Sequence, residues 1–238
     1  MAIKAPDDAE KAAIMTISTG RGDVINNNTF SNLRLEGLGS GAAQGLGLNE
    51  NGNVLVENVE FENLGIGIEA GGIQDGFEVK NSDFTNVSTG IRYYSNDDSN
   101  FGYRKNKGLV VFTGNDFSDF SGADTALQIG RDGIPAYADF DQEIDATGNY
   151  WGVTTGSDID SDKISRSNSA GGVKVDFSTY LLNVTNNAAG TGFEGDFSEL
   201  GVTEEGDSIN GGRIGKAVEL LQDGEKTGGA RNIEVEEG

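Results

Sequence analysis

Two neighbouring stretches of the sequence, VLVENVEFENLGIGI at 54–68 and FEVKNSDFTNVSTGI at 77–91, follow one pattern of residue types. In each, an apolar residue stands five positions before a phenylalanine, and asparagines stand three positions before it and two after it. The two phenylalanines, Phe61 and Phe84, are 23 residues apart. A pattern that recurs at this interval is typical of repeat architectures, in which each repeat packs on the next.

The pattern extends in both directions, to VINNNTFSNL at 24–33 and VVFTGNDFSDF at 110–120. The aromatic positions are separated by 31, 23, 33 and 33 residues, and they are Phe30, Phe61, Phe84, Phe117 and Tyr150. A minimum of 23 residues with insertions of eight to ten indicates a constant repeat unit with loops of variable length.

Short apolar segments of this chain alternate with period two, and Gly, Asn, Ser and Asp separate them, as in strands joined by turns. No helical periodicity precedes residue 210, so a helical repeat is excluded. Parallel strands would stack about 4.8 Å apart, with like residues above one another and Asn27, Asn58 and Asn81 at a bend. The sequence therefore predicts an all-β fold, a single parallel β-helix with coils of about 23 to 33 residues.

The repeat resembles the right-handed parallel β-helix repeat of the pectin-lyase-like superfamily. NYWG at 149–152 and VDFSTYL at 175–181 look like the final coil of bacterial surface and extracellular members. The resemblance covers roughly residues 13–182, and it departs at Tyr150, where Trp is more usual, and at Thr179, where Pro is. It implies a β-helix over 1–182 and a location outside the cell or on its surface. It implies no activity, because the superfamily includes lyases, hydrolases, epimerases, adhesins and inert stalks.

After a predicted irregular linker at 183–208, the pattern changes in the final segment, 209–238. GGRIGKAVELLQDGEK has apolar residues at helical spacing with Gly224 as its C-cap, and RNIEVEEG alternates like a strand. Two interpretations are open: a local cap on the repeat, or the start of a following module that contacts another subunit. Under the second, the assembly residues are Ile214, Val218, Leu221, Ile233 and Val235.

The composition restricts the partners. With 39 acidic and 17 basic residues the formal net charge is −22, which repels nucleic acid and anionic membranes. The chain has neither Cys nor His, so disulfides, thiolate nucleophiles and imidazole bases are absent. No apolar run approaches the roughly 20 residues of a membrane-spanning helix, and the first residues, MAIKAP, do not resemble a signal peptide. We expect no nucleic acid and no membrane insertion.

The insertion RYYSNDDSNFGYRKNKG at 92–108 is rich in aromatic and basic residues. Aromatic rings stack on sugar faces, and Arg and Lys pair with the carboxylates of acidic sugars. The candidate carbohydrate-binding residues are Arg92, Tyr93, Tyr94, Tyr103, Arg104 and Lys105. The alternative is an ordinary Ω-loop packed by its own aromatic residues.

Acidic clusters suggest Ca²⁺ as the only expected ion, although no cofactor is required. Asp97 and Asp98 lie in the insertion, and two further clusters are DFDQEID at 139–145 and DIDSD at 158–162. The candidate ligands are Asp97, Asp98, Asp139, Asp141, Glu143, Asp158, Asp160 and Asp162. Lys163 and Ser169 stand where an EF-hand needs Gly and Glu, so that motif is excluded, and solvated acidic faces are the alternative to metal binding.

Two functions are compatible with these patterns. The first is an extracellular structural or adhesive module that assembles head to tail with copies of itself or with neighbouring modules through the C-terminal segment. The second is a carbohydrate-active domain that uses the 92–108 insertion to bind polysaccharide or to act as a polysaccharide lyase. No catalytic set, phosphate loop or nucleotide motif occurs, which favours the first.

Overall fold

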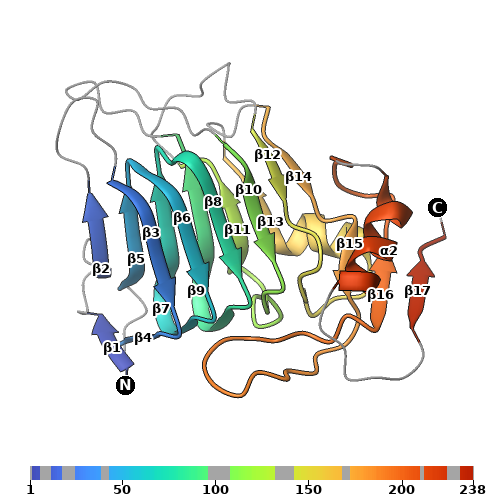
Figure 1. Ribbon diagram of the computed structural model, residues 1–238, viewed down its shortest axis with the longest axis horizontal. Coiled ribbons are helices and arrows are strands. Elements are labelled where there is room, and N and C mark those ends of the chain that lie inside the picture. Colours follow the sequence, from blue (N-terminus) through green and yellow to red (C-terminus); the bar gives the residue numbers. More distant parts are fainter. Residues whose placement is uncertain are drawn as a thin grey trace.

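The computed structural model describes residues 2–5, 12–17, 25–38, 43–95, 108–131, 142–167, 172–209, 212–223 and 231–237. Seventeen strands form three sheets in this part of the chain (Figure 1). The eight-stranded sheet contains β1 (Ala2–Ala5), β2 (Ala12–Ile17), β4 (Arg34–Gly37), β5 (Gln44–Asn49), β7 (Glu60–Gly71), β9 (Asp83–Tyr94), β11 (Thr125–Ile129) and β13 (Ile164–Arg166). The six-stranded sheet contains β3 (Ile25–Ser31), β6 (Asn51–Glu57), β8 (Gln74–Lys80), β10 (Val110–Thr113), β12 (Glu143–Asp145) and β14 (Lys174–Asp176).

The third sheet is small and mixed, with β15 (Thr179–Leu181), β16 (Glu199–Val202) and β17 (Asn232–Val235). Strand β16 pairs antiparallel with β15 and parallel with β17. The helical segments are α1 (Gly156–Asp158), a π-helical turn, η1 (Ile159–Lys163), and α2 (Arg213–Asp223). The fold is thus rich in β-structure, with one longer helix near its C-terminal end.

The prediction of a single β-helix solenoid is wrong as a fold class, although the predicted C-terminal helix and strand are present as α2 and β17. The strands instead form two parallel sheets, and a third, mixed sheet takes up the C-terminal strand. The spacing of the repeat predicts which residues lie side by side. It does not predict which strands join into one sheet, because that depends on backbone hydrogen bonds between segments distant in the sequence. Strands β7 and β9 each continue for 12 residues, and the direction of pairing reverses between β15 and β16.

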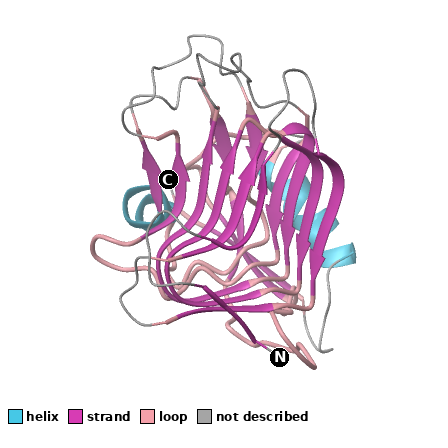
Figure 2. Ribbon diagram, turned by 90° about the vertical axis from the view of Figure 1, so that its left-hand side faces the viewer, coloured by secondary structure: helices cyan, strands magenta, loops and turns pink. Residues whose placement is uncertain are grey.

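Equivalent positions of the repeat do lie side by side. Strands β7 and β9 pair in parallel with Phe61 opposite Phe84 and Ile68 opposite Ile91. The rings of Phe61 and Phe84 stack at 4.7 Å between centroids, and Phe117 continues the column at 5.2 Å from Phe84. Trp151 ends it at 5.0 Å from Phe117. Figure 2 looks along this stack from the end that carries the N-terminus, where the strands overlie one another.

Asparagines occupy bends both between strands and within β7 and β9, because this residue tolerates the left-handed backbone conformation. The φ angles are +54° at Asn58 and +51° at Asn81, and +56° and +52° at Asn63 and Asn86. The side-chain amide of Asn86 also donates to Oδ1 of Asn63 at 2.7 Å. Each bend is therefore held both by its own backbone and by the layer beside it.

A second set of polar side chains is buried at a corner of the core. Asn115 and Asn149 are fully buried. The Nδ2 of Asn149 donates to the carbonyl oxygens of Phe112 and Ala146, at 2.6 and 2.7 Å. Its Oδ1 accepts from the backbone N and from Nδ2 of Asn115, at 2.9 and 3.0 Å. One side chain thus satisfies four buried groups, which would otherwise each cost free energy.

A strap, residues 183–195, runs back from β15 across the outside of the layers; it is the orange loop below the strands in Figure 1. Thr191 donates its hydroxyl to the carbonyl of Asn58 at 3.0 Å, and the backbone N of Phe193 donates to the carbonyl of Asn81 at 2.9 Å. Gly192, at φ +88°, lies so close that a Cβ atom there would be 2.4 Å from the oxygen of Asn81. Only glycine fits this crossing point.

Candidate assembly interface

Helix α2 has apolar residues on two sides, and only one side is buried. Ala217 and Leu221, four positions apart, pack in a second core with side chains of β15, the strap and β16. Ile214 and Val218, also four positions apart, are 57% and 41% exposed. The helix therefore packs on its own chain, as the local-cap interpretation predicts, and it still presents apolar residues to solvent.

Strand β17 likewise has one apolar side chain packed against the second core and one that is exposed. Ile233 lies opposite Leu200 and packs against the second core, whereas Val235 lies opposite Val202 and is 56% exposed. These four residues share one face of the sheet because side chains two positions apart point the same way. The helix covers only part of that face. We call Ile214, Val218 and Val235 the end patch.

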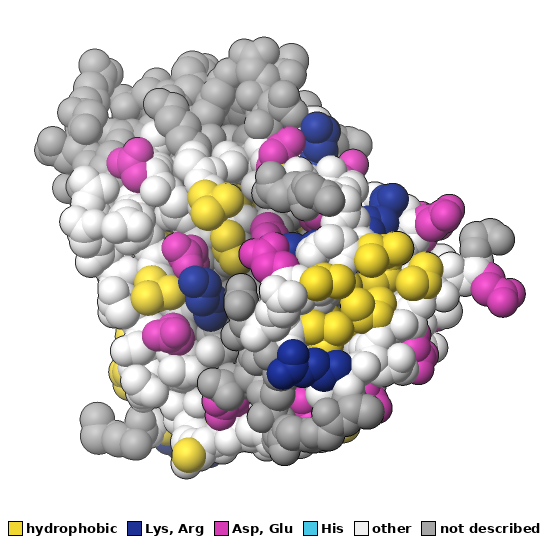
Figure 3. All heavy atoms as spheres, turned by 45° about the vertical axis from the view of Figure 1, so that its right-hand side comes forward, with side chains coloured by type: hydrophobic (Ala, Val, Ile, Leu, Met, Phe, Trp, Pro, Cys, Tyr) yellow, Lys and Arg dark blue, Asp and Glu magenta, His cyan; other side chains and the backbone are white. Residues whose placement is uncertain are grey.

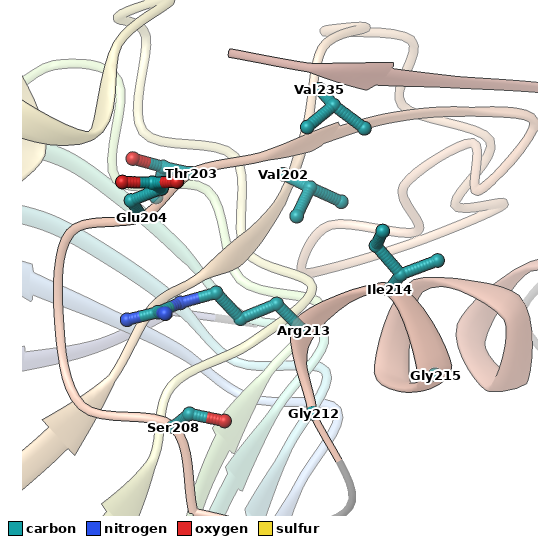
Figure 4. A pocket seen from close by; sticks show the side chains of 9 residues that line it. All are labelled: Val202, Thr203, Glu204, Ser208, Gly212, Arg213, Ile214, Gly215 and Val235. Atoms are coloured by element: carbon teal, nitrogen blue, oxygen red, sulfur yellow. The ribbon is translucent and has the colours of Figure 1, made fainter. Parts of the chain in front are cut away.

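A groove of about 450 Å³ lies between the first turn of α2 and strands β16 and β17. In Figure 4, Val202 and Val235 extend from the two strands, and Ile214 extends from the helix toward them. Arg213, Ser208 and Glu204 supply polar groups to the lining. Figure 3 shows apolar side chains gathered on this end of the molecule. An exposed apolar area of this kind, rimmed by polar groups, is typical of an interaction site.

A hollow of about 530 Å³ adjoins the groove and is strongly acidic. Its carboxylates are Glu204, Glu205, Glu236 and Glu237, and hydroxyls come from Thr155, Ser157 and Thr203. The carboxylate of Glu236 is fixed, because Oε1 accepts from the hydroxyl of Tyr180 at 2.5 Å and from the backbone N of Gly156 at 2.8 Å. Burial, and then Glu236, raises the pKa of Tyr180 well above its ordinary value.

The strands of the eight- and six-stranded sheets lie one layer above another, and we call them the strand stack. Its two ends differ. At the C-terminal end, the backbone N of Asp207 donates to the carbonyl of Val175 at 3.1 Å, and that of Thr203 donates to Ser178 at 3.0 Å. Residues 203–207 thus bond to β14 and to the residues just after it, while β13 ends the eight-stranded sheet and β17 is one of the two terminal strands of the third sheet. At the opposite end, β1, β2 and β3 are the terminal strands. Half-buried Ile3, Ile14, Phe30 and Leu33 lie there against the main core.

No protein-family model, no curated protein and no solved structure matches this chain. The functional assignment therefore depends on the geometry of the chain itself. None of the described helices is long and apolar enough to cross a membrane.

The candidate carbohydrate-binding residues divide into two groups. Tyr103, Arg104 and Lys105 lie outside the described residues. The others are engaged within the protein: Tyr93 is buried, and Arg92 donates to Gln128 at 2.7 Å and lies 3.7 Å from the carboxylate of Glu69. A carbohydrate-active role for this insertion stays a prediction.

Sequence reasoning missed the buried carboxylate at the centre of this cluster. Oxygens of Glu69 accept from Nε2 of Gln44 at 2.7 Å and from the hydroxyl of Tyr94 at 3.2 Å, and Arg131 lies at 3.1 Å. Burial, and then the charge of Glu69, raises the pKa of Tyr94 to about 12. A lyase base needs a depressed pKa, so Tyr94 is unsuited to that role.

The candidate calcium ligands are not brought together in the part of the chain that the structure describes. Asp97, Asp98, Asp139 and Asp141 lie outside it. Glu143 lies 3.4 Å from Lys174, and Asp160 pairs with Arg166 at 2.7 Å, so each has a cationic partner. Among the described residues, Asp158 and Asp162 join no group of three or more acidic side chains that would hold a metal ion. Calcium binding stays a prediction.

A row of acidic side chains crosses the bend region and was also missed. Glu60, Asp83 and Asp116 are paired positions on successive layers, and Tyr150 follows them. Burial, then Asp116 and Glu60, raises the pKa of Asp83 to about 6, and burial also raises the pKa of Asp116. The signal was present in the repeat, since Glu60 and Asp83 are 23 positions apart.

Asp83→Asn should stabilise the protein at neutral pH. The raised pKa means that the folded state holds its proton more tightly than the unfolded state, so the charged form costs stability above pH 6 and the cost disappears below about pH 4. We expect Tm to rise by about 2–6 °C at pH 7.5, with little change at pH 4. Calorimetry at both values, with exposed Glu205→Gln as control, checks this. An equal shift at both pH values would contradict it.

Proposed function

We propose that the protein is a structural module whose copies join end to end through the end patch and the opposite end of the strand stack. The observation that supports this is the exposed apolar patch beside a terminal strand, at an end where the chain has already covered its own core. Terminal strands are ready to pair with another chain, and apolar residues beside them favour such pairing. A location outside the cell stays a prediction.

The contact joins two different surfaces, so it is heterologous. One copy offers the end patch and β17, and the next offers β1, β2 and β3 with their half-buried core residues. Heterologous contacts form open chains of subunits unless the rotation between copies closes a ring. The product would be a filament or a tandem array, with the layers of each module in line with those of the next.

The strength of the contact depends on salt. Complete burial of a Val or Ile side chain contributes about 1.5–3 kcal/mol. The end patch residues are 41–57% exposed before association, so each contributes less than this full value. Copies with a net charge of −22 repel one another, and salt screens this repulsion over about 10 Å at 0.1 M. We expect association to be concentration-dependent and stronger at high ionic strength.

Sedimentation velocity tests this proposal. The full chain should sediment as a monomer at low concentration and low salt, and as a series of larger species at high concentration in 0.5 M NaCl. Val235→Asp should abolish the larger species. Val184→Asp is the matched control, because Val184 is equally exposed at 56% but lies on the strap. A chain that stays monomeric under all conditions, or equal effects of the two variants, would overturn the proposal.

A further inference from the structure

We infer that strand β17 of one copy pairs with strand β1 of the next, as an edge-to-edge addition that makes the third sheet of one copy continuous with the eight-stranded sheet of its neighbour. The inference rests on the proposed function and identifies the contacting strands. Both strands have four residues, and both are terminal in their sheets.

Apolar and charged side chains alternate along both strands in the same way. In β17, Ile233 and Val235 point to the face of α2, and Glu234 points to the other face. In β1, Ile3 packs against the main core, and Lys4 alternates with it and has a side chain that is 56% exposed. Edge-to-edge pairing keeps the faces continuous, so Ile3 would lie beside the end patch and Lys4 beside Glu234.

Charge distinguishes β1 from the other terminal strands at that end. Strand β2, AAIMTI, and strand β3, INNNTFS, carry no charged residue, whereas β1, AIKA, carries Lys4. The carboxylates around β17 and the groove are Glu204, Glu205, Glu234, Glu236 and Glu237. Among the described residues of its own copy, Lys4 pairs with Glu36 at 3.5 Å, an exposed contact that contributes little to stability. A basic terminal strand therefore suits this acidic end better than an uncharged one does.

The apolar part of the contact gives β1 a second advantage. On the face of β16 and β17 that α2 covers in part, Val202 is 2% exposed, whereas Val235, opposite it on β17, is 56% exposed. A strand added outside β17 would place its inward side chain along the same face, over Val235 and toward Ile214. Ile3 would be that side chain, and it would extend the apolar edge that Val235 gives to the groove.

Disulfide cross-linking tests the inference, because the natural chain contains no cysteine to interfere. Glu234→Cys in one full-length chain is mixed with Lys4→Cys in another at assembling concentration, and oxidised. Separate mixtures replace Lys4→Cys by Met15→Cys in β2 or Thr29→Cys in β3, both at exposed positions. Bridged cysteines need Cα atoms about 4.4–6.8 Å apart, so only paired strands cross-link efficiently.

We expect the Glu234→Cys and Lys4→Cys mixture to give at least about fivefold more cross-linked dimer than the other mixtures, read on non-reducing gels and by mass spectrometry. More cross-linking to β2 or β3, or assembly without cross-linking to β1, would overturn this inference and leave end-to-end assembly intact. Absence of larger species in sedimentation of the unmodified chain would overturn both.

Charge exchange gives an independent readout. Lys4→Glu should weaken association about two- to fivefold, and adding Glu234→Lys to the same chain should restore it. A loss that the second substitution does not restore would contradict the pairing of these two positions.

Discussion

Replacing Phe84 by alanine is expected to lower the free energy of unfolding by about 3–5 kcal/mol. The ring is completely buried and lies between two others, stacked on Phe61 at 4.7 Å and on Phe117 at 5.2 Å. Without the ring, the protein loses the free energy gained by moving that apolar group from water into the core. A cavity also remains in the middle of the aromatic column, because the rigid neighbouring layers cannot fill it. Urea denaturation followed by circular dichroism measures the loss.

The control for this variant is Thr85→Ala, at the next position of β9, where the side chain is exposed. It leaves the aromatic column intact and should change stability by less than about 0.5 kcal/mol. A loss of under 1 kcal/mol for Phe84→Ala would show that the layers collapse onto one another and that the column does not hold a fixed spacing.

Asn149→Leu is the second substitution with a large expected effect. Leucine has a similar size, but it leaves the carbonyls of Phe112 and Ala146 and the backbone N of Asn115 without this partner, whereas Nδ2 of Asn115 keeps its bond to Val79. Each buried group that loses its only partner costs about 1–3 kcal/mol, so we expect a total of about 3–5 kcal/mol after partial relaxation.

Thermal and urea unfolding measure this loss, with Asn26→Leu on β3 as the matched control. Asn26 is exposed, so the same chemical change there should have an effect within about 0.5 kcal/mol. If the two variants were equally stable, the hydrogen bonds of Asn149 would contribute nothing beyond what water supplies.

The sequence predicted correctly which residues lie side by side, but not how the strands are divided among sheets. The offset of 23 placed Phe61 beside Phe84, and these residues are indeed paired. The same offset gave no information on where one sheet ends, because Asn63 and Asn86 bend the backbone without ending β7 and β9. The reversal at β15 and β16 also follows no repeat, since it depends on contacts that only the folded chain makes.

The candidate site shows the same limit. Helical spacing marked four apolar residues together, Ile214, Ala217, Val218 and Leu221. In the structure they form two sides of the helix, since Ala217 and Leu221 are buried and the other two are exposed. Sequence alone therefore left undecided which side the protein buries. The choice is made by the second core, where Leu200 and Phe193 meet α2 from segments distant in the sequence.

The strap has a consequence for the order of folding. Its hydrogen bond from Thr191 to Asn58 joins residues 133 positions apart, whereas neighbouring layers join residues about 23 to 36 positions apart. Contacts between residues so distant along the chain are late and slow to form. Once closed, the strap links the opening of the last layers to that of β6 and β8. Amide hydrogens across this region should therefore exchange with a common free energy of opening.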